Sequence, residues 1–319
     1  MSHPANPDVV TVTLNPAIDL TVTLDRLAVG CVQRASGAVA NCGGKGVNVA
    51  GCLADWGARV VATGVLGRSN DGAFADFFAD KGIVDRFVRI AGETRTNIKI
   101  ADKASGETTD VNLPGLTVSD GAFGSVRAAL ERAAAPGRPV ALAGSLPESM
   151  PVTAWATLVA DLARQGARVV LDTSGPPLAA ALDGGQRLHA VKPNRAELEA
   201  LLGRPLPTVA DIVAAARSLL DRVALVVVSL GADGALFVDR ESALAAALPV
   251  KKTLSTVGAG DAMVAGIAAA LVEGASLDRL ARLAVAFATS KLDRIGPFLG
   301  PTDDVERLAA AVCMTALRF

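Results

Sequence analysis

The fold is decided by the runs PVALAG (residues 139–144), ARVVLD (167–172), HAVK (189–192) and ALVVVSL (224–230), with helical patterns between them near 152–164, from Gly175 and from Ala196. An unbroken apolar run is typical of a parallel strand that is covered on both faces. Short strands that alternate with helices form βαβ units. The sequence therefore predicts a three-layer α/β/α fold with a mostly parallel sheet.

The first third of the chain carries a different pattern. TVTL (11–14) and LTVTL (20–24) flank Asn15-Pro16, while RTNIKIA (95–101) and ETTDVNL (107–113) flank the turn-forming residues 103–106. Such alternating segments suit hairpin strands with one exposed face, and they cannot all extend a parallel sheet. We expect a small antiparallel β-sheet lid, with its strands within about 10–40 and 90–115, over a cleft.

Helical periodicity dominates the chain after Gly258. It predicts helices near 259–274, 277–292 and 303–317. The sequence contains neither a linker-like stretch nor an internal repeat. We therefore expect residues 1–319 to form one domain.

Composition argues against polyanions and membranes as partners. The 31 basic and 32 acidic residues give a net charge of −1, and neither sign forms a long block. Without a basic stripe, nucleic acid is not an expected partner. The apolar run 262–272 is much shorter than the roughly 20 residues that span a bilayer, so no membrane segment is expected.

Cysteine usage and the amino terminus indicate a cytoplasmic protein. The four cysteines lack metal-ligand spacing, and the chain has two histidines, so the sequence does not suggest a zinc site. The first dozen residues do not have the basic start and apolar stretch of a secretory signal. A reducing compartment fits both observations.

The most informative motif is STVGAGD (255–261), which runs directly into the apolar helix AMVAGIAAAL. The unpaired N–H groups and positive dipole end of a helix start form an anion site, here at Gly258, Ala259 and Gly260. Asp261 beside it could act as a general base in phosphoryl transfer. The alternative is a structural turn followed by a helix-start acid, which the macrodipole also favours.

A second glycine cluster, NCGGKGVNVA (41–50), also opens a helix. Gly44 would let a substrate approach the backbone, Lys45 could bind a phosphate, and Asn48 offers a further polar contact. A Gly-Gly-Lys-Gly turn can equally be only a loop. The sequence contains no G-x-x-x-x-G-K-[ST] motif and no G-x-G-x-x-G after a strand, which disfavours P-loop and dinucleotide-binding enzymes.

A third cluster lies where the strand HAVK meets the next helix, at the edge of an α/β sheet where ligands bind. Lys192 and Asn194 could reach nucleotide phosphates, and Glu197 could hold Mg²⁺ through water. The alternative is a capping box, because Glu197 follows Asn194 by three residues.

The remaining candidates are single residues with a structural and a functional interpretation. The loop with Ser229, Gly231 and Gly234 is either a hairpin turn or a nucleotide contact. Asp19 is a turn acid or an acceptor for sugar hydroxyls, and Arg95 is a strand cation or a phosphate clamp. Ser145 belongs either to a loop or to the site.

Taken in order, NPAID, GGKGVNVA, TRTNIKI, AGSLP, VKPNRAE, SLGADG and STVGAGD resemble the ribokinase-like (phosphofructokinase B type) sugar kinases. The resemblance spans almost the whole chain. It is greatest to the branch that contains 1-phosphofructokinase and tagatose-6-phosphate kinase. Lys45 in GGKG and the string TRTNIKI look most like the former, which makes fructose 1,6-bisphosphate from fructose 1-phosphate.

This resemblance implies ATP and Mg²⁺ as cofactors, a phosphorylated ketohexose as substrate, and a role for each candidate. Asp261 would be the base, with Gly258, Ala259 and Gly260 as the anion hole. ATP would be held by Lys192, Asn194, Ser229, Gly231 and Gly234, and hydrated magnesium by Glu197. The sugar phosphate would be held by Asp19, Gly44, Lys45, Asn48, Arg95 and Ser145.

Other functions of the same fold stay open from the sequence. Tagatose-6-phosphate kinases and 6-phosphofructokinases share much of the pattern, and kinases of unphosphorylated sugars or nucleosides would not need both Lys45 and Arg95. A non-catalytic sugar-phosphate sensor is disfavoured by the intact Gly258–Asp261 stretch. The exposed edge of the lid suggests a homodimer that pairs through it.

Overall fold

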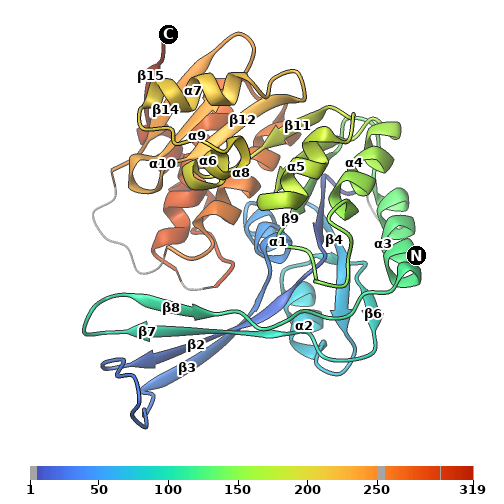
Figure 1. Cartoon of the computed structure of the whole chain (residues 1–319), viewed down its shortest axis with the longest axis vertical. Helices are drawn as coiled ribbons and strands as arrows, with labels where there is room; N and C mark the ends of the chain where they lie inside the picture. The colour runs from blue at the N-terminus through green and yellow to red at the C-terminus, as the bar shows by residue number, and fades with distance from the viewer. Residues whose placement is uncertain (1–5, 250–255, 295, 319) are drawn as a thin grey trace.

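The computed structural model describes residues 6–249, 256–294 and 296–318, and Ser255 of the STVGAGD motif lies outside them. The described residues form a large 11-stranded sheet and a separate 4-stranded sheet (Figure 1). The strands of the large sheet are β1 (Val9–Thr13), β4 (Val60–Gly67), β5 (Val84–Asp85), β6 (Val88–Ile90), β9 (Pro139–Ala143), β10 (Arg168–Asp172), β11 (Leu188–Val191), β12 (Val223–Ser229), β13 (Ala235–Val238), β14 (Ala243–Ala247) and β15 (Cys313–Ala316).

The large sheet runs in the order β15-β14-β13-β12-β11-β10-β9-β1-β4-β5, with β6 also on β4. All pairs from β12 to β5 are parallel, and the three pairs from β12 to β15 are antiparallel. The apolar runs of the sequence occupy the parallel part, where both faces are covered. The predicted α/β class is confirmed.

Helices cover both faces of this sheet. Val9 of β1 packs into one core cluster and Val10 into the other, because successive strand residues point to opposite faces. One cluster contains α1, α8 and α9, and the other contains α3, α4 and α7. The helices are α1 (Lys45–Asp55), α2 (Gly72–Asp80), α3 (Asp120–Ala133), α4 (Ala154–Arg164), α5 (Gly175–Asp183), α6 (Arg195–Leu202), α7 (Val209–Arg217), α8 (Ala259–Glu273), α9 (Leu277–Leu292) and α10 (Thr302–Ala311), with a short 3₁₀ turn at Gly231–Asp233.

The second sheet, which we call the lid, projects from the body beside the site (Figure 1). Its strands are β2 (Ala17–Leu24), β3 (Gly37–Gly43), β7 (Thr96–Asp102) and β8 (Thr108–Val111), in the order β3-β2-β7-β8. The two outer pairings are antiparallel, as the sequence suggests, whereas the central pairing of β2 with β7 is parallel. The lid is thus a mixed sheet. The predicted hairpin strand at TVTL is wrong, because residues 11–13 belong to β1, which is fully buried and pairs in parallel with β4 and β9 of the large sheet.

The carboxyl end of the chain corrects the predicted helix over 303–317. Helix α10 ends at Ala311, and Val312 is extended, with φ −61° and ψ 125°. Residues Cys313–Ala316 then pair with β14 and complete the sheet. The unpaired backbone groups of β14 decide this strand, and local periodicity does not reveal them. No helix of the described residues has the length and apolarity needed to cross a membrane.

Candidate active site

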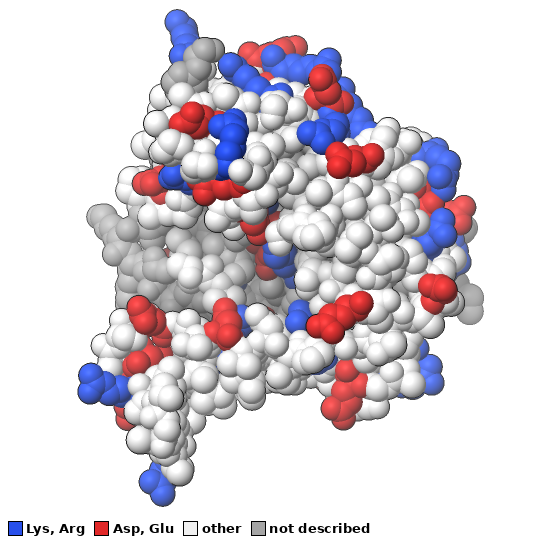
Figure 2. All heavy atoms as spheres, in the orientation of Figure 1, with Lys and Arg blue, Asp and Glu red and all other residues white. Residues whose placement is uncertain are grey.

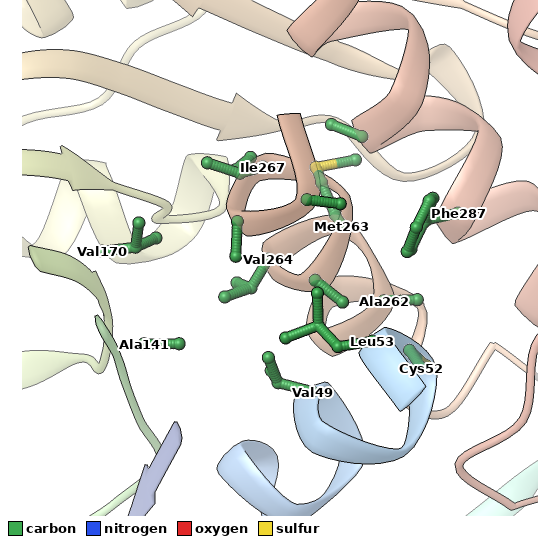
Figure 3. Packing of buried hydrophobic residues seen from close by; sticks show 14 of the residues in the cluster. Val49, Cys52, Leu53, Ala141, Val170, Ala262, Met263, Val264, Ile267 and Phe287 are labelled. Atoms are coloured by element: carbon green, nitrogen blue, oxygen red, sulfur yellow. The ribbon is translucent and has the colours of Figure 1, made fainter. Parts of the chain in front are cut away.

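The amino end of α8 is the centre of the candidate site, and its position is fixed by the core. Every residue from Asp261 to Leu271 is buried. Figure 3 shows Ala262, Met263, Val264 and Ile267 packed among side chains of α1, α9 and the sheet. Gly258 begins the helix with φ 80°, a left-handed conformation that glycine adopts without strain. The first turn is therefore held rigidly at the base of the cleft.

Asp261 lies in this first turn with only 7% of its surface exposed. Its Oδ2 accepts a hydrogen bond of 2.7 Å from Nδ2 of Asn48 on α1. Burial raises the pKa of Asp261 to about 6, against the opposing pull of the Lys45 ammonium. A helix-start acid of purely structural value would sit in solvent, where its charge costs little, so this buried carboxylate fits a functional group better.

Two backbone donors beside Asp261 are available to an anion. The N–H of Ala259 donates to the Thr256 carbonyl oxygen at 3.3 Å. The N–H groups of Gly260 and Asp261 have no acceptor among the described residues, as expected for the first turn of a helix. The N–H groups that an anion could use at this helix start therefore include those of Gly260 and Asp261, whereas the N–H of Ala259 is already bonded.

A buried carboxylate that sequence reasoning missed ties two predicted lysines together. Asp172, at the end of β10 and 1% exposed, lies 3.2 Å from Nζ of Lys45 and 3.5 Å from Nζ of Lys192. Burial disfavours the Lys45 ammonium, but Asp172 and Asp261 outweigh that effect and raise the pKa of Lys45. The sequence signal that could have identified Asp172 is its position as the acidic residue at the end of the run ARVVLD.

One cavity of about 420 Å³ collects all the predicted acceptor-side residues. Its lining includes Asp261 together with Asp19, Gly44, Lys45, Asn48, Arg95 and Ser145. Figure 2 shows the hollow between body and lid, with basic and acidic side chains inside it. The proposed base and the proposed phosphate contacts thus share one space, as a kinase requires.

Arg95 of the lid is a cation with spare donors at the edge of this cavity. Its guanidinium donates to the carbonyl oxygens of Pro16, Asn15 and Leu113 at 3.1–3.3 Å. Three of its five N–H donors are used in this way, so two remain for a ligand. Among the described residues no carboxylate forms an ion pair with Arg95, and Asp19 acts on its charge only from a distance.

Further lid residues in the cavity were absent from the sequence-based set. Asn97 donates from Nδ2 to Asp19 Oδ1 at 3.2 Å, and burial raises the pKa of Asp19. Lys99 lines the same cavity and lies 3.4 Å from Asp110. Asn97 and Lys99 stand two and four residues after Arg95, so the period of two along a strand was the signal that could have identified them.

A second cavity, of about 520 Å³, lies on the other side of the α8 amino end. Its lining includes Ser229, Gly231 and Gly234 from the β12–β13 hairpin, with Ala259 and Gly260. Its other walls are largely apolar and include Met263 and Val285, which suits a flat aromatic base. The loop is therefore a hairpin turn that is also placed to contact a nucleotide, so the two interpretations do not exclude each other.

Lys192 and Asn194 are placed differently from each other. A Cβ built on Gly260 would lie 3.5 Å from Nζ of Lys192, so this ammonium touches the anion site. The side chain of Asn194 instead accepts from the Glu197 N–H at 2.8 Å and lines a separate cavity with Ser229. Only Lys192 of this pair reaches the amino end of α8.

The predicted capping box of α6 is present, and it bears on the proposed magnesium contact. One Glu197 oxygen accepts from the backbone N–H of Asn194 at 2.8 Å, which leaves the other oxygen free. No three potential ligand side chains cluster among the described residues. This donor set fits an ion that keeps its waters and binds mainly through nucleotide phosphates, as Mg²⁺ does.

Comparison with known proteins agrees with the resemblance in the sequence. Residues 12–301 match the pfkB family of carbohydrate kinases. A 1-phosphofructokinase of Xanthomonas campestris pv. campestris is 50% identical, over 97% of this chain and 98% of the relative. A 1-phosphofructokinase of Rhodobacter capsulatus is 45% identical, over 97% and 98%. The structure of phosphofructokinase-2 from Escherichia coli in complex with fructose-6-phosphate aligns with a TM-score of 0.88 at 30% identity, over 95% and 98%.

Proposed function

The chain belongs to the pfkB family of carbohydrate kinases, and we propose that it transfers the γ-phosphoryl group of ATP to fructose 1-phosphate, giving fructose 1,6-bisphosphate and ADP. The observation that carries this proposal is the position of Asp261. It lines the cavity that holds Lys45 and Arg95, while Gly260 beside it lines the cavity suited to a nucleotide. The 1-phosphofructokinases among its relatives support the choice of sugar.

In the proposed reaction, Asp261 accepts the proton of the sugar's C6 hydroxyl. The hydroxyl oxygen then forms a bond to the γ-phosphorus while the bond from that phosphorus to the bridging β,γ-oxygen breaks, and ADP leaves. The N–H groups of Gly260 and Asp261 and the ammonium groups of Lys45 and Lys192 stabilise the charge on the transferred group. Asp172 favours the charged form of Lys45 and holds both lysines in place.

Magnesium, when bound, supplies positive charge to the nucleotide phosphates. The free oxygen of Glu197 would hold it through water. Lys192 and the 229–234 hairpin orient the nucleotide from the protein side. Asn194 contributes indirectly, because its capping bond fixes the α6 turn that carries Glu197.

The lid is proposed to select the sugar phosphate. Asp19, supported by Asn97, accepts from sugar hydroxyls, and the two spare donors of Arg95 bind the phosphate already on the sugar. Ser145 lies 3.1 Å from Asn15 at the same end of the cavity and adds a hydroxyl contact. Closure of the lid would exclude water and limit hydrolysis of ATP.

The decisive assay is coupled detection of ADP with fructose 1-phosphate, fructose 6-phosphate, tagatose 6-phosphate, fructose and ribose, each with ATP and Mg²⁺. We expect the highest kcat/KM with fructose 1-phosphate and the lowest with the unphosphorylated sugars. A higher value for tagatose 6-phosphate or fructose 6-phosphate would reassign the substrate. Equal values for fructose and its phosphates would reject Arg95 as the phosphate contact.

We also propose a homodimer through the lid. The edge strand β3 exposes 53% of Val39, and the loop before it exposes nearly all of Val29 and Val32. Exposed apolar side chains on an unpaired edge favour association of two copies. Light scattering of the wild type and of Val39→Lys tests this, and a monomeric wild type would contradict it.

A cytoplasmic location is proposed from the chemistry of the cysteines and the substrates. Cys31, Cys42, Cys52 and Cys313 form no disulfide in the structure. Free thiols persist in a reducing compartment, which is also where ATP is available. Fractionation of cells that produce the protein tests the location directly.

A further inference from the structure

Lys291 is a buried cation that the proposed mechanism does not use. It lies in the last turn of α9 and is 3% exposed. Its Nζ donates a hydrogen bond of 2.7 Å to the carbonyl oxygen of Arg294. A Cβ built on Gly258 would lie 3.3 Å from its Cε and 4.0 Å from its Nζ, so the end of this side chain packs against the turn that starts α8.

Among the lysines that the structure describes, Lys291 alone has no carboxylate counter-ion. Of the six lysines in the described residues, five lie within 3.5 Å of a carboxylate oxygen: Lys45, Lys81, Lys99, Lys103 and Lys192. Lys291 forms no ion pair with any described residue. Burying an unpaired ammonium costs free energy, so its retention needs a reason beyond packing.

A structural role at the end of α9 is the simpler explanation. A cation in the last turn does stabilise a helix, and Lys291 donates to a carbonyl that follows the helix. That benefit is available to an exposed side chain, which would not incur the cost of burial. This structural role therefore explains why a cation ends the helix, but it does not explain why the side chain is buried.

The buried position places the charge next to the site. Lys291 lines a cavity of about 100 Å³ with Asp19, Asn48 and Gly258, between the lid and the start of α8. Burial lowers the pKa of Lys291, which the Asp261 carboxylate partly opposes. An ammonium in such a poorly solvated place acts more strongly on its neighbours than a surface lysine.

We propose that Lys291 is an internal monovalent cation, whose ammonium holds the Gly258 turn and adds fixed positive charge behind the anion site of α8. It is a positioning residue for the proposed kinase reaction, on which this inference rests. The ammonium is bound by the Arg294 carbonyl oxygen and packs against the helix start, so it supplies there the fixed charge that a free monovalent cation would otherwise have to supply. Activity should therefore not depend on added potassium or ammonium ions.

The test compares the wild type with Lys291→Met, which keeps the unbranched apolar part of the side chain and removes the ammonium group. Lys81→Met is the matched control, because Lys81 is also largely buried but pairs with Asp55 outside the cavities of the site. The kcat and the KM for ATP are measured with MgATP and fructose 1-phosphate in a tetramethylammonium buffer, with and without 100 mM K⁺ or NH₄⁺ (roughly physiological ionic strength). Melting temperatures are recorded in parallel.

We expect the kcat of the wild type to be unchanged by K⁺ or NH₄⁺. In Lys291→Met we expect kcat to fall by about tenfold or more, less than for loss of a direct anion-hole donor, with little change in the KM for ATP. Added K⁺ or NH₄⁺ should restore several-fold of that loss, which a purely structural role would not predict. Lys81→Met should lose stability and show no response to the cations.

The inference is overturned if the wild type is strongly activated by K⁺, if Lys291→Met keeps the wild-type kcat, or if its loss resists both cations. A similar cation response in Lys81→Met would overturn it too. If Lys291→Met does not fold, the wild type and Lys291→Arg, which keeps the charge, carry the test, and strong K⁺ activation of either rejects the inference. A wild type inactive on every sugar phosphate instead rejects the proposed function.

Discussion

The two walls of the candidate site are built differently. On the body side, Asp261, Asp172 and Lys192 are each at most 7% exposed and stand on elements that the core holds. On the lid side, Asp19, Arg95 and Lys99 are only partly buried and stand on a sheet that projects away from the core (Figure 1). The body thus fixes the reacting groups in place, whereas the lid presents side chains that are open to a substrate.

This difference separates chemistry from recognition. Burial shifts the pKa of Asp261 and strengthens charge interactions around the transferred group. The lid offers donors and acceptors for hydroxyls and a phosphate in a place that solvent can reach. Changes in the body should therefore affect kcat, and changes in the lid should affect KM for the sugar phosphate.

The largest effect is expected from Asp261→Asn. Loss of the general base should lower kcat by about two to four powers of ten, while ATP binding measured by calorimetry stays nearly intact. Asp278→Asn is the control, because Asp278 is also an acid in the first turn of a helix but is exposed and paired with Arg282. Near-normal turnover of Asp261→Asn would show that this acid only starts the helix.

Asp172→Asn should have the next largest effect, on stability. It leaves Lys192 buried without its partner and removes a partner of Lys45. Removing one member of a buried pair costs about 3 kcal/mol or more, measured by denaturant unfolding. Asp183→Asn, which breaks an exposed pair with Arg222, should cost at most about 1 kcal/mol. Equal losses of stability in the two variants would mean that the buried ion pairs of the body contribute no more than an exposed pair.

Arg95→Ala tests the lid side. We expect the KM for fructose 1-phosphate to rise by about ten- to a hundredfold, because charge-assisted hydrogen bonds contribute about 1.5–3 kcal/mol, while kcat changes little. Lys103→Ala removes an exposed lid cation that pairs with Asp25 outside the cavity, and it should be silent. An equal loss of kcat/KM with fructose would contradict a phosphate contact at Arg95.

The pH dependence gives the smallest effect. The pKa of Asp261 is raised to about 6 from 3.8, so the base is protonated below that pH, and kcat should fall by about tenfold per pH unit there. Because the pKa of Asp261 is higher in the folded state than in the unfolded state, the protonated carboxyl stabilises the fold. This contribution to the free energy of unfolding is fully present below about pH 3.8 and is lost as pH rises through about 6.

Asp172→Asn sharpens this pH test. The Asp172 charge contributes to the raised pKa of Asp261, so its removal should move the acidic limb of the kcat profile to lower pH. A limb that stays at the same pH in this variant would assign the titration to another group. The charged groups of the body that act on Asp261 are Lys45, Lys192, Lys291 and Asp172.

The sequence by itself determined the parallel body, the lid segments and the order of the motifs. Unbroken apolar runs are typical of strands buried on both faces and alternating segments of half-buried strands, so β9 to β12 and β2, β7 and β8 were readable locally. TVTL (11–14) was not, because it alternates and yet its residues 11–13 belong to the fully buried β1. The glycines before Lys45 and Asp261 likewise predicted the starts of α1 and α8. The pfkB family membership then confirmed the resemblance of these motifs.

Only the tertiary structure determined which charged side chains meet in the site and which strand forms one edge of the large sheet. In the sequence, Asp172 is an ordinary strand-end acid and Lys291 an ordinary helix-end cation. Their roles depend on neighbours far along the chain, because Lys45 lies more than 100 residues from Asp172 and Gly258 lies about 30 residues from Lys291. Strand β15 exists because β14 leaves backbone groups unpaired, which the helical pattern of 303–317 could not reveal. Periodicity reports local burial, whereas desolvation, ion pairing and edge pairing depend on contacts between distant parts of the chain.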